Sequence, residues 1–204
     1  TLKKVDLIVC EDTRNTSKLL ERYQIKTPAA CFYKKNGPKA VKPSLAFEFI
    51  LNNLKKGKNV ALVTDAGTPG ISDPGNQLVE KAIDSGNIVI PIPGASALTT
   101  LASVSGIDLS KFIFLGLPPH KKGRETFFRE VAAFNYPIIY YDSPYRVVKN
   151  LELLKKIAPN KNTILGRELT KIFEEIVRGT VEEVLKYFSE NKDKVKGEFV
   201  IIVY

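Results

Sequence analysis

The sequence predicts an α/β protein made of two halves, and three observations carry this prediction. Short apolar, partly β-branched runs recur along the chain, as expected of strands that are covered on both faces. Runs with helical spacing separate them, so strands and helices alternate as in βαβ units. Near residue 110 a linker is followed by a restart of this pattern, which predicts an N-terminal α/β domain over residues 1–109 and a C-terminal α/β domain over residues 110–204.

Length and composition are typical of a globular protein with a sizeable core. The chain has 204 residues, of which 44% are hydrophobic and 26% are charged. It shows no signal-peptide pattern and no apolar run long enough to span a membrane, so we expect a cytoplasmic protein without a membrane partner. Cys10, Cys31 and His120 have no metal-ligand spacing, and we predict no metal site.

The net charge of +9 is spread over both halves of the chain. A folded basic surface suits a polyanionic partner, with nucleic acid as the first candidate. Lysine-rich surfaces also serve solubility alone, so charge by itself leaves the two interpretations open.

The first predicted strand, residues 5–10, leads into Glu11, Asp12, Thr13 and Arg14, and a helix follows over residues 17–23. Acidic residues at the end of a strand often bind a ribose hydroxyl in nucleotide-binding sheets. Asp12 can equally cap the helix and pair with Arg14. The next predicted elements are a short strand at residues 29–33, a polar loop at 34–43 and a helix at 45–54.

The stretch from Val60 to Gly75 is the most informative part of the chain. A buried strand runs into a loop rich in glycine and proline, which is longer than the connection needs. Asp73 and Pro74 predict a helix start, with Asp73 as N-cap, and this helix ends near Gly86. A ligand of such a sheet lies beyond the carboxyl ends of its strands, so we interpret this loop as a ligand loop.

The same order is repeated directly afterwards. A strand is predicted over residues 88–92, followed by a turn at Pro93 and Gly94 and by a helix with Ser96 as its N-cap, which ends at Gly106. Residues 107–110 are the predicted linker.

The C-terminal half alternates in the same way. Its predicted strands cover residues 112–117, 137–141, 163–165, 172–177 and 197–204. Its predicted helices include Phe127 to Val131, Val147 to Leu154 with Asp142 as cap, and Val181 to Phe188. A basic loop, residues 120–124, connects the first of these strands to its helix.

Several blocks of sequence resemble a known family. ThrAspAlaGlyThrProGlyIleSerAspProGly (64–75) and IleProIleProGlyAlaSerAla (90–97) resemble the tetrapyrrole-methylase-like class of S-adenosylmethionine methyltransferases. Within that class, further blocks resemble the members that methylate a cytidine ribose 2′-hydroxyl in 16S rRNA of the small ribosomal subunit. These blocks are CysGluAspThrArg (10–14), TyrAspSerProTyrArg (141–146), GlyArgGluLeuThrLys (166–171), ArgGlyThr (178–180) and GlyGluPhe (197–199).

The resemblance implies a fold of two α/β domains with S-adenosylmethionine in the cleft between them. Family members open with a strand that ends in a Pro-Ile-Gly-Asn type turn, and this sequence begins after that point. We therefore expect the N-terminal domain to lack its first strand. The cofactor-binding residues carried over by matching position are Asp65, Ala66, Gly67, Thr68, Pro69, Gly70, Ile71, Pro93, Gly94, Ser96, Ala97, Tyr141 and Asp142.

The implied function is S-adenosylmethionine-dependent 2′-O-methylation of a cytidine in 16S rRNA, by an enzyme that family members suggest is a homodimer. Methyl transfer to a hydroxyl benefits from a base, and a neutral lysine or a carboxylate can serve. The catalytic candidates are Lys171, Glu174 and Arg14, with Arg14 suited more to phosphate. The candidates for RNA binding are Arg14, Lys121, Lys122, Arg124 and Arg146. Tyr33 and Tyr145 lie in polar settings that fit base stacking.

Two other functions stay open at this point. One is a methyltransferase of the same fold that acts on a tetrapyrrole precursor or on a protein, although those relatives have Gly-Asp-Pro where this chain has Gly67, Thr68 and Pro69. The other is an RNA-binding protein without catalysis, for which the missing first strand is the supporting feature.

Overall fold

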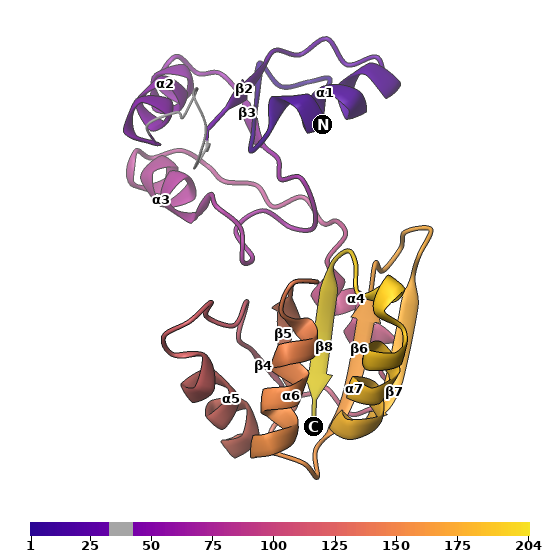
Figure 1. Cartoon of the computed structure of the whole chain (residues 1–204). Helices are drawn as coiled ribbons and strands as arrows, with labels where there is room; N and C mark the ends of the chain where they lie inside the picture. The colour runs from indigo at the N-terminus through magenta and orange to yellow at the C-terminus, as the bar shows by residue number, and fades with distance from the viewer. Residues whose placement is uncertain (33–42) are drawn as a thin grey trace. The chain divides into compact units, whose positions relative to one another are not determined.

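The computed structural model describes residues 1–32 and 43–204, so Tyr33 and nearly all of the predicted loop at 34–43 lie outside the described residues. The chain forms two compact units, Thr1–Ala95 (unit 1) and Ser96–Tyr204 (unit 2), which Figure 1 draws in a continuous colour gradient. The predicted boundary after residue 109 differs from this division. The helix that begins at Ala97 belongs to unit 2, because its Leu101 packs against the sheet of that unit.

Unit 1 contains a three-stranded parallel sheet. Its strands are β1 (Leu7–Cys10), β2 (Ala29–Cys31) and β3 (Val60–Leu62), in the spatial order β2-β1-β3. The central strand β1 is buried along its whole length, as its unbroken apolar run predicts. The parallel sheet predicted for this half of the chain is confirmed.

Three helices complete unit 1, namely α1 (Thr13–Arg22), α2 (Pro43–Lys55) and α3 (Asn76–Asp84). One core cluster joins Leu7 and Val9 of β1 to Phe47 and Ile50 of α2 and to Leu78 of α3. The carboxyl ends of the strands therefore lead directly into α1 and into the glycine-rich loop that precedes α3.

The predicted strand over residues 88–92 is wrong. This segment has no regular secondary structure, and the side chains of Ile88 and Ile90 are 89% and 72% exposed. Strand β3 pairs with β1 on one side, and among the described residues no strand pairs with its other edge. An apolar run forms a strand when its N–H and C=O groups meet those of a neighbouring strand. Residues 88–92 have no such neighbour in the part of the chain that the structure describes.

Unit 2 contains a five-stranded mixed sheet in the order β4-β5-β8-β6-β7. Its strands are β4 (Ile113–Phe114), β5 (Ile138–Asp142), β6 (Asn162–Arg167), β7 (Glu175–Thr180) and β8 (Phe199–Val203). Strand β8 pairs antiparallel with both β5 and β6, so the last strand in sequence lies in the centre of the sheet (Figure 1).

Helices cover both faces of this sheet. They are α4 (Ala97–Ser103), α5 (Arg124–Ala133), α6 (Val147–Ile157) and α7 (Val181–Glu190), followed by a short 3₁₀ helix at Lys192–Lys194. Residues of α5, α6 and α7 pack on the face that carries Tyr140 and Ile201. Leu101 of α4 packs on the opposite face, against Ile139 and Ile202. The alternation of β5 and β8 residues between two cores is what the strand period of two requires.

Two predicted helix caps are wrong, because the side chains are used elsewhere. Helix α3 begins after Gly75, and the Asp73 carboxylate accepts a hydrogen bond from Thr64. Helix α6 begins after Arg146, and Asp142 is the last residue of β5. Asp12, in contrast, caps α1 by accepting a hydrogen bond from the Arg14 N–H, one of the two roles that its position allowed.

Candidate functional site

The glycine-rich loop of unit 1 leaves β3 with an exposed and strongly curved backbone. Gly67 and Gly70 have φ of +71° and +82°, a conformation that glycine adopts without steric cost. A Cβ placed on Gly67 would meet no atom within 4 Å, whereas a Cβ on Gly70 would lie 2.5 Å from Oδ1 of Asn76. The loop is therefore closed at Gly70 by α3 and open at Gly67, where a ligand can approach the backbone.

The second predicted cofactor segment begins beside this loop. Thr68 Oγ1 donates a hydrogen bond to the carbonyl oxygen of Ala95, at 3.1 Å. Pro93, Gly94 and Ala95 are exposed, and Ser96 is the N-cap of α4 without a side-chain cap bond. Residues that the sequence separates widely, Thr68 and Ala95, thus lie in direct contact.

Carboxylates gather at the carboxyl ends of β1 and β3. The Thr64 hydroxyl lies within hydrogen-bond distance of the Glu11 carboxylate and, at 2.9 Å, of the Asp73 carboxylate. Burial is the largest influence on Glu11 and raises the pKa of its carboxyl; the hydrogen bond from Thr64 lowers the pKa, and the charge of Asp73 raises it again. The net shift is upward, so Glu11 binds a proton more readily than an exposed glutamate.

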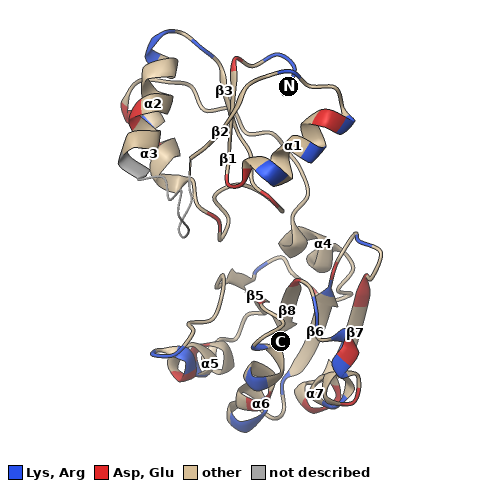
Figure 2. Ribbon diagram, turned by 45° about the horizontal axis from the view of Figure 1, so that its top comes forward, with Lys and Arg blue, Asp and Glu red and all other residues tan. Residues whose placement is uncertain are grey.

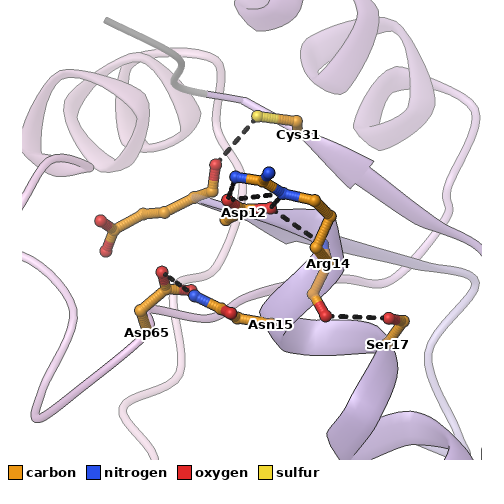
Figure 3. Close-up of polar contacts among 7 residues, drawn as sticks. Asp12, Arg14, Asn15, Ser17, Cys31 and Asp65 are labelled. Carbon is orange, nitrogen blue, oxygen red and sulfur yellow. Dashed lines mark hydrogen bonds and ion pairs between the residues drawn. The ribbon is translucent and has the colours of Figure 1, made fainter.

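Polar contacts around the start of α1 fix the neighbouring side chains (Figure 3). The Arg14 guanidinium donates to the Asp12 carboxylate, with Nη2 2.5 Å from Oδ2, while the Arg14 side chain stays largely exposed. Asn15 Nδ2 donates to Asp65 Oδ2 at 2.8 Å and so connects α1 to the glycine-rich loop. Arg14 therefore carries its charge at the surface, already paired with one carboxylate.

In unit 2, the candidate site centres on the end of β5. Asp142 is buried, and its two carboxylate oxygens accept hydrogen bonds from Ser143 N at 2.7 Å and from Asn150 Nδ2 at 2.8 Å. Burial raises the pKa of Asp142 and outweighs the lowering by these bonds and by Arg146 and Arg124. The adjacent Tyr141 N–H donates to the carbonyl oxygen of Gly116 at 2.8 Å, and its ring packs on Phe114.

Arg146 connects the end of β5 to the basic loop. Its Nη1 donates to the carbonyl oxygen of Pro118 at 3.1 Å, and its Nε donates to Ser143 Oγ at 3.1 Å. Lys121 and Lys122 are exposed in that loop, and Arg124 is the first residue of α5. The predicted RNA-binding residues of unit 2 thus belong to one stretch of surface, where Figure 2 shows Lys and Arg at the start of α5.

The loop between β6 and β7 holds the other catalytic candidates. Lys171 Nζ lies 2.9 Å from Glu168 Oε1 and 2.9 Å from Glu198 Oε2. Burial alone would lower the pKa of Lys171, but the hydrogen bonds to these two carboxylates outweigh it and the net pKa is raised. Lys171 is therefore held as an ammonium group, which disfavours the role of a neutral base. Glu174 is exposed and accepts a hydrogen bond from Thr170 N at 2.5 Å.

Some residues of these sites were not selected from the sequence. Glu11 stands in a block that carried the family resemblance, but its partners Thr64 and Asp73 come from another part of the chain. Asn150 reads as one polar residue on an amphipathic helix, and its complete burial beneath Asp142 depends on how α6 packs. The signal available in the sequence was a polar residue among the apolar positions of α6.

Residues 1–32 and 43–204 contain neither a metal-binding cluster nor a membrane-spanning helix. Within these ranges, no group of three or more His, Cys, Asp or Glu side chains is arranged to hold a metal ion. None of the helices there is both long and apolar enough to cross a bilayer.

Comparison with known proteins gives concordant results. The profile of the family described as tetrapyrrole (corrin/porphyrin) methylases matches residues 1–185. A protein of Thermotoga maritima named ribosomal RNA small subunit methyltransferase I is 41% identical over 203 residues, which cover 100% of this chain and 88% of that protein. A Bacillus subtilis protein of the same name is 40% identical over 100% of this chain and 67% of its own length.

Two solved structures with a similar fold are those of methyltransferases. The cobalt precorrin-4 methyltransferase CbiF superimposes with a TM-score of 0.70 and 14% identity, covering 98% of this chain and 84% of that chain. The methyltransferase CobJ superimposes with a TM-score of 0.65 and 17% identity, covering 99% and 84%. At these identities the likeness concerns the fold, and the predicted α/β fold of this class is confirmed.

Proposed function

The chain belongs to the tetrapyrrole methylase family, and from this premise we propose that it methylates a cytidine ribose 2′-hydroxyl in 16S rRNA with S-adenosylmethionine as methyl donor. The observation that carries the proposal is 41% identity, over the whole chain, to a relative named ribosomal RNA small subunit methyltransferase I. The net charge of +9 supports an RNA substrate. The proposed enzyme is a homodimer that acts in the cytoplasm on the small ribosomal subunit.

The described residues fit the proposed cofactor. The backbone at Gly67 is exposed, adopts φ of +71° and has open space where a Cβ would stand. We assign the methionine end of S-adenosylmethionine to the segment from Asp65 to Ile71, together with Pro93, Gly94, Ser96 and Ala97. Tyr141 and Asp142 of unit 2 are assigned to the adenosine part. In an extended strand the N–H and C=O of one residue point to the same side, so the Tyr141 carbonyl faces the connection that follows β4.

When bound, S-adenosylmethionine supplies a methyl group on a sulfonium, which the ribose oxygen attacks in line. The chain orients the ribose hydroxyl and accepts its proton. Of the three catalytic candidates, Lys171 is held as an ammonium and Arg14 stays protonated, so the Glu174 carboxylate is the remaining proton acceptor. Glu11 is a second candidate, because burial raises its pKa toward the working pH of a general base.

We assign phosphate binding to Arg14, Lys121, Lys122, Arg124 and Arg146. Lys171 has a positioning role in this proposal, since its ammonium joins the β6–β7 loop to the residue that precedes β8. The variants Glu174→Gln and Glu11→Gln distinguish the two proton acceptors. The variant in which the true base is replaced is expected to lose methyl-transfer activity while its affinity for S-adenosylmethionine stays unchanged. Its rate is expected to recover in part as pH rises.

The experiment that tests the function combines the protein, S-adenosylmethionine with a labelled methyl group, and small ribosomal subunits from cells that lack the gene. Label on a 16S rRNA ribose, located by mass spectrometry of nuclease fragments, is the expected result. Cofactor binding by calorimetry without label on rRNA would contradict the substrate and favour a tetrapyrrole precursor or a protein. Retention of rRNA without cofactor binding would favour the non-catalytic RNA-binding alternative.

A further inference from the structure

The turn between β5 and α6 presents an aromatic ring to solvent. Tyr145 is 89% exposed, whereas the aromatic side chains of the core of unit 2, such as Tyr140 and Phe188, are fully buried. A tyrosine ring left in water loses the free energy that burial of its apolar face would give. Tyr145 lies in the block TyrAspSerProTyrArg, outside both the cofactor residues and the cation set assigned above.

The backbone beneath this ring is held firmly. Arg146 N and Val147 N donate to the Ser143 carbonyl oxygen at 3.0 Å each, which closes the turn around Tyr145. Ser143 N is bound to Asp142, and Asp142 is bound to the buried Asn150 of α6. The ring is therefore displayed on a preorganised turn, so little further ordering of the protein is needed when a flat partner packs on it.

The surface beside Tyr145 carries unneutralised positive charge. Arg146 is joined to Pro118 and so brings the basic loop next to the turn. Some cations elsewhere in unit 2 are paired, as in Lys155–Glu182 and Lys194–Glu175. Over residues 1–32 and 43–204, no ion pair involves Lys121, Lys122 or Arg124.

A second exposed aromatic side chain gives the contrast. Phe173 is 68% exposed in the β6–β7 loop, whose charged residues include Glu168, Lys171 and Glu174. Carboxylates repel phosphate groups, so Phe173 is less suited than Tyr145 to stack on a base that is flanked by phosphates. Tyr145 is an exposed ring whose surroundings match a polyanion that also carries flat aromatic groups.

We propose that Tyr145 is a stacking platform for one unpaired base of the RNA substrate, while Lys121, Lys122 and Arg124 bind the phosphates that flank this base. The inference rests on the proposed function and deepens it, because it names the residue that recognises the single-stranded character of the RNA. Stacking on an aromatic ring contributes about 1–3 kcal/mol per base, which corresponds to about 5-fold to about 150-fold in affinity.

The test compares Tyr145→Ala, Tyr145→Phe and Tyr145→Leu with the control Tyr136→Ala. Tyr136 is a 47% exposed tyrosine of the same unit, before β5, with Lys111 over its ring. The readouts are KM for small ribosomal subunits, affinity for a fluorescein-labelled single-stranded RNA copied from the 16S decoding region, and affinity for S-adenosylmethionine. Circular dichroism checks that each variant is folded.

Tyr145→Ala and Tyr145→Leu are expected to weaken RNA affinity about 5-fold to about 150-fold and to raise KM in parallel, with S-adenosylmethionine affinity unchanged. Tyr145→Phe is expected to behave as wild type, because stacking needs the ring and not the hydroxyl. RNA affinity of Tyr145→Ala equal to that of Tyr136→Ala would overturn the inference. RNA affinity does not depend on turnover, so a wild-type protein that fails to methylate small subunits contradicts the proposed function and leaves this test decisive.

Discussion

Similar apolar runs have different structures in the two units, a buried strand in unit 2 and an exposed irregular segment in unit 1. In unit 2, Phe199–Val203 is buried along its whole length between β5 and β6. In unit 1, residues 88–92 have the same β-branched character, yet Ile88 and Ile90 are exposed and no ladder formed by residues 1–32 and 43–204 includes them. The difference teaches that composition makes a segment able to form a strand, while neighbouring strands decide whether it becomes one.

The largest expected effect comes from placing a charged side chain in each of the two apolar runs. Ile201→Asp puts an unpaired carboxylate into the core of unit 2, and we expect a loss of more than about 4 kcal/mol in the free energy of unfolding, enough to unfold the unit. Ile90→Asp should change the free energy of unfolding by less than about 0.5 kcal/mol, because its side chain already faces solvent. Urea denaturation followed by circular dichroism measures both. An equal loss in Ile90→Asp would mean that residues 88–92 are paired in solution.

A second prediction compares one left-handed glycine from each unit. Gly67→Val and Gly123→Val both force a β-branched residue to positive φ, +71° and +86°, and each should lose about 1–3 kcal/mol of stability. Calorimetric titration with S-adenosylmethionine is expected to show lost binding for Gly67→Val and unchanged binding for Gly123→Val. A folded Gly67→Val protein with wild-type affinity would count directly against the cofactor loop.

A third prediction uses the side-chain caps of the two units. Thr180 and Glu183 form a reciprocal capping box at the start of α7, and Asp12 caps α1. We expect Thr180→Ala and Asp12→Ala each to lower the free energy of unfolding by about 1 kcal/mol. Thr126→Ala, on the exposed surface of α5, is the matched control. Urea midpoints that do not differ from the control would show that the caps contribute nothing.

The smallest expected effect is the pH dependence of stability that comes from one carboxyl group in each unit whose pKa is raised by burial. The pKa of Asp142 is raised in the folded state above its ordinary value of 3.8. Its contribution to stability is therefore fully present below pH 3.8 and is lost as pH rises through the raised pKa. Thermal unfolding over a pH series should show wild type losing stability relative to Asp142→Asn over this window. Glu11→Gln in unit 1 should behave with the same sign, from the ordinary glutamate value of 4.5 upward. If the difference in thermal stability between wild type and variant stays constant with pH, the raised pKa values of Asp142 and Glu11 are contradicted.

Local patterns predicted much of the fold. The apolar runs at Leu7–Cys10 and Phe199–Val203 are strands, and the helix predicted from Val181 to Phe188 is α7. Asp73 and Asp142 were misassigned as caps, since the sequence does not say that Thr64 and Asn150 occupy them. The contacts that build the candidate site, such as Thr68 with Ala95, join distant parts of the chain and follow from tertiary packing. The site residues themselves stay predictions that the experiments above test.

The central position of β8 has a consequence for biosynthesis. Strands β4 to β7 emerge from the ribosome before β8 does, and β5 and β6 pair with each other through β8 alone. The sheet of unit 2 therefore cannot close until Val203 has left the exit tunnel, while β1, β2 and β3 of unit 1 have all emerged once Leu62 has. During translation, these three strands are able to pair well before the five strands of unit 2.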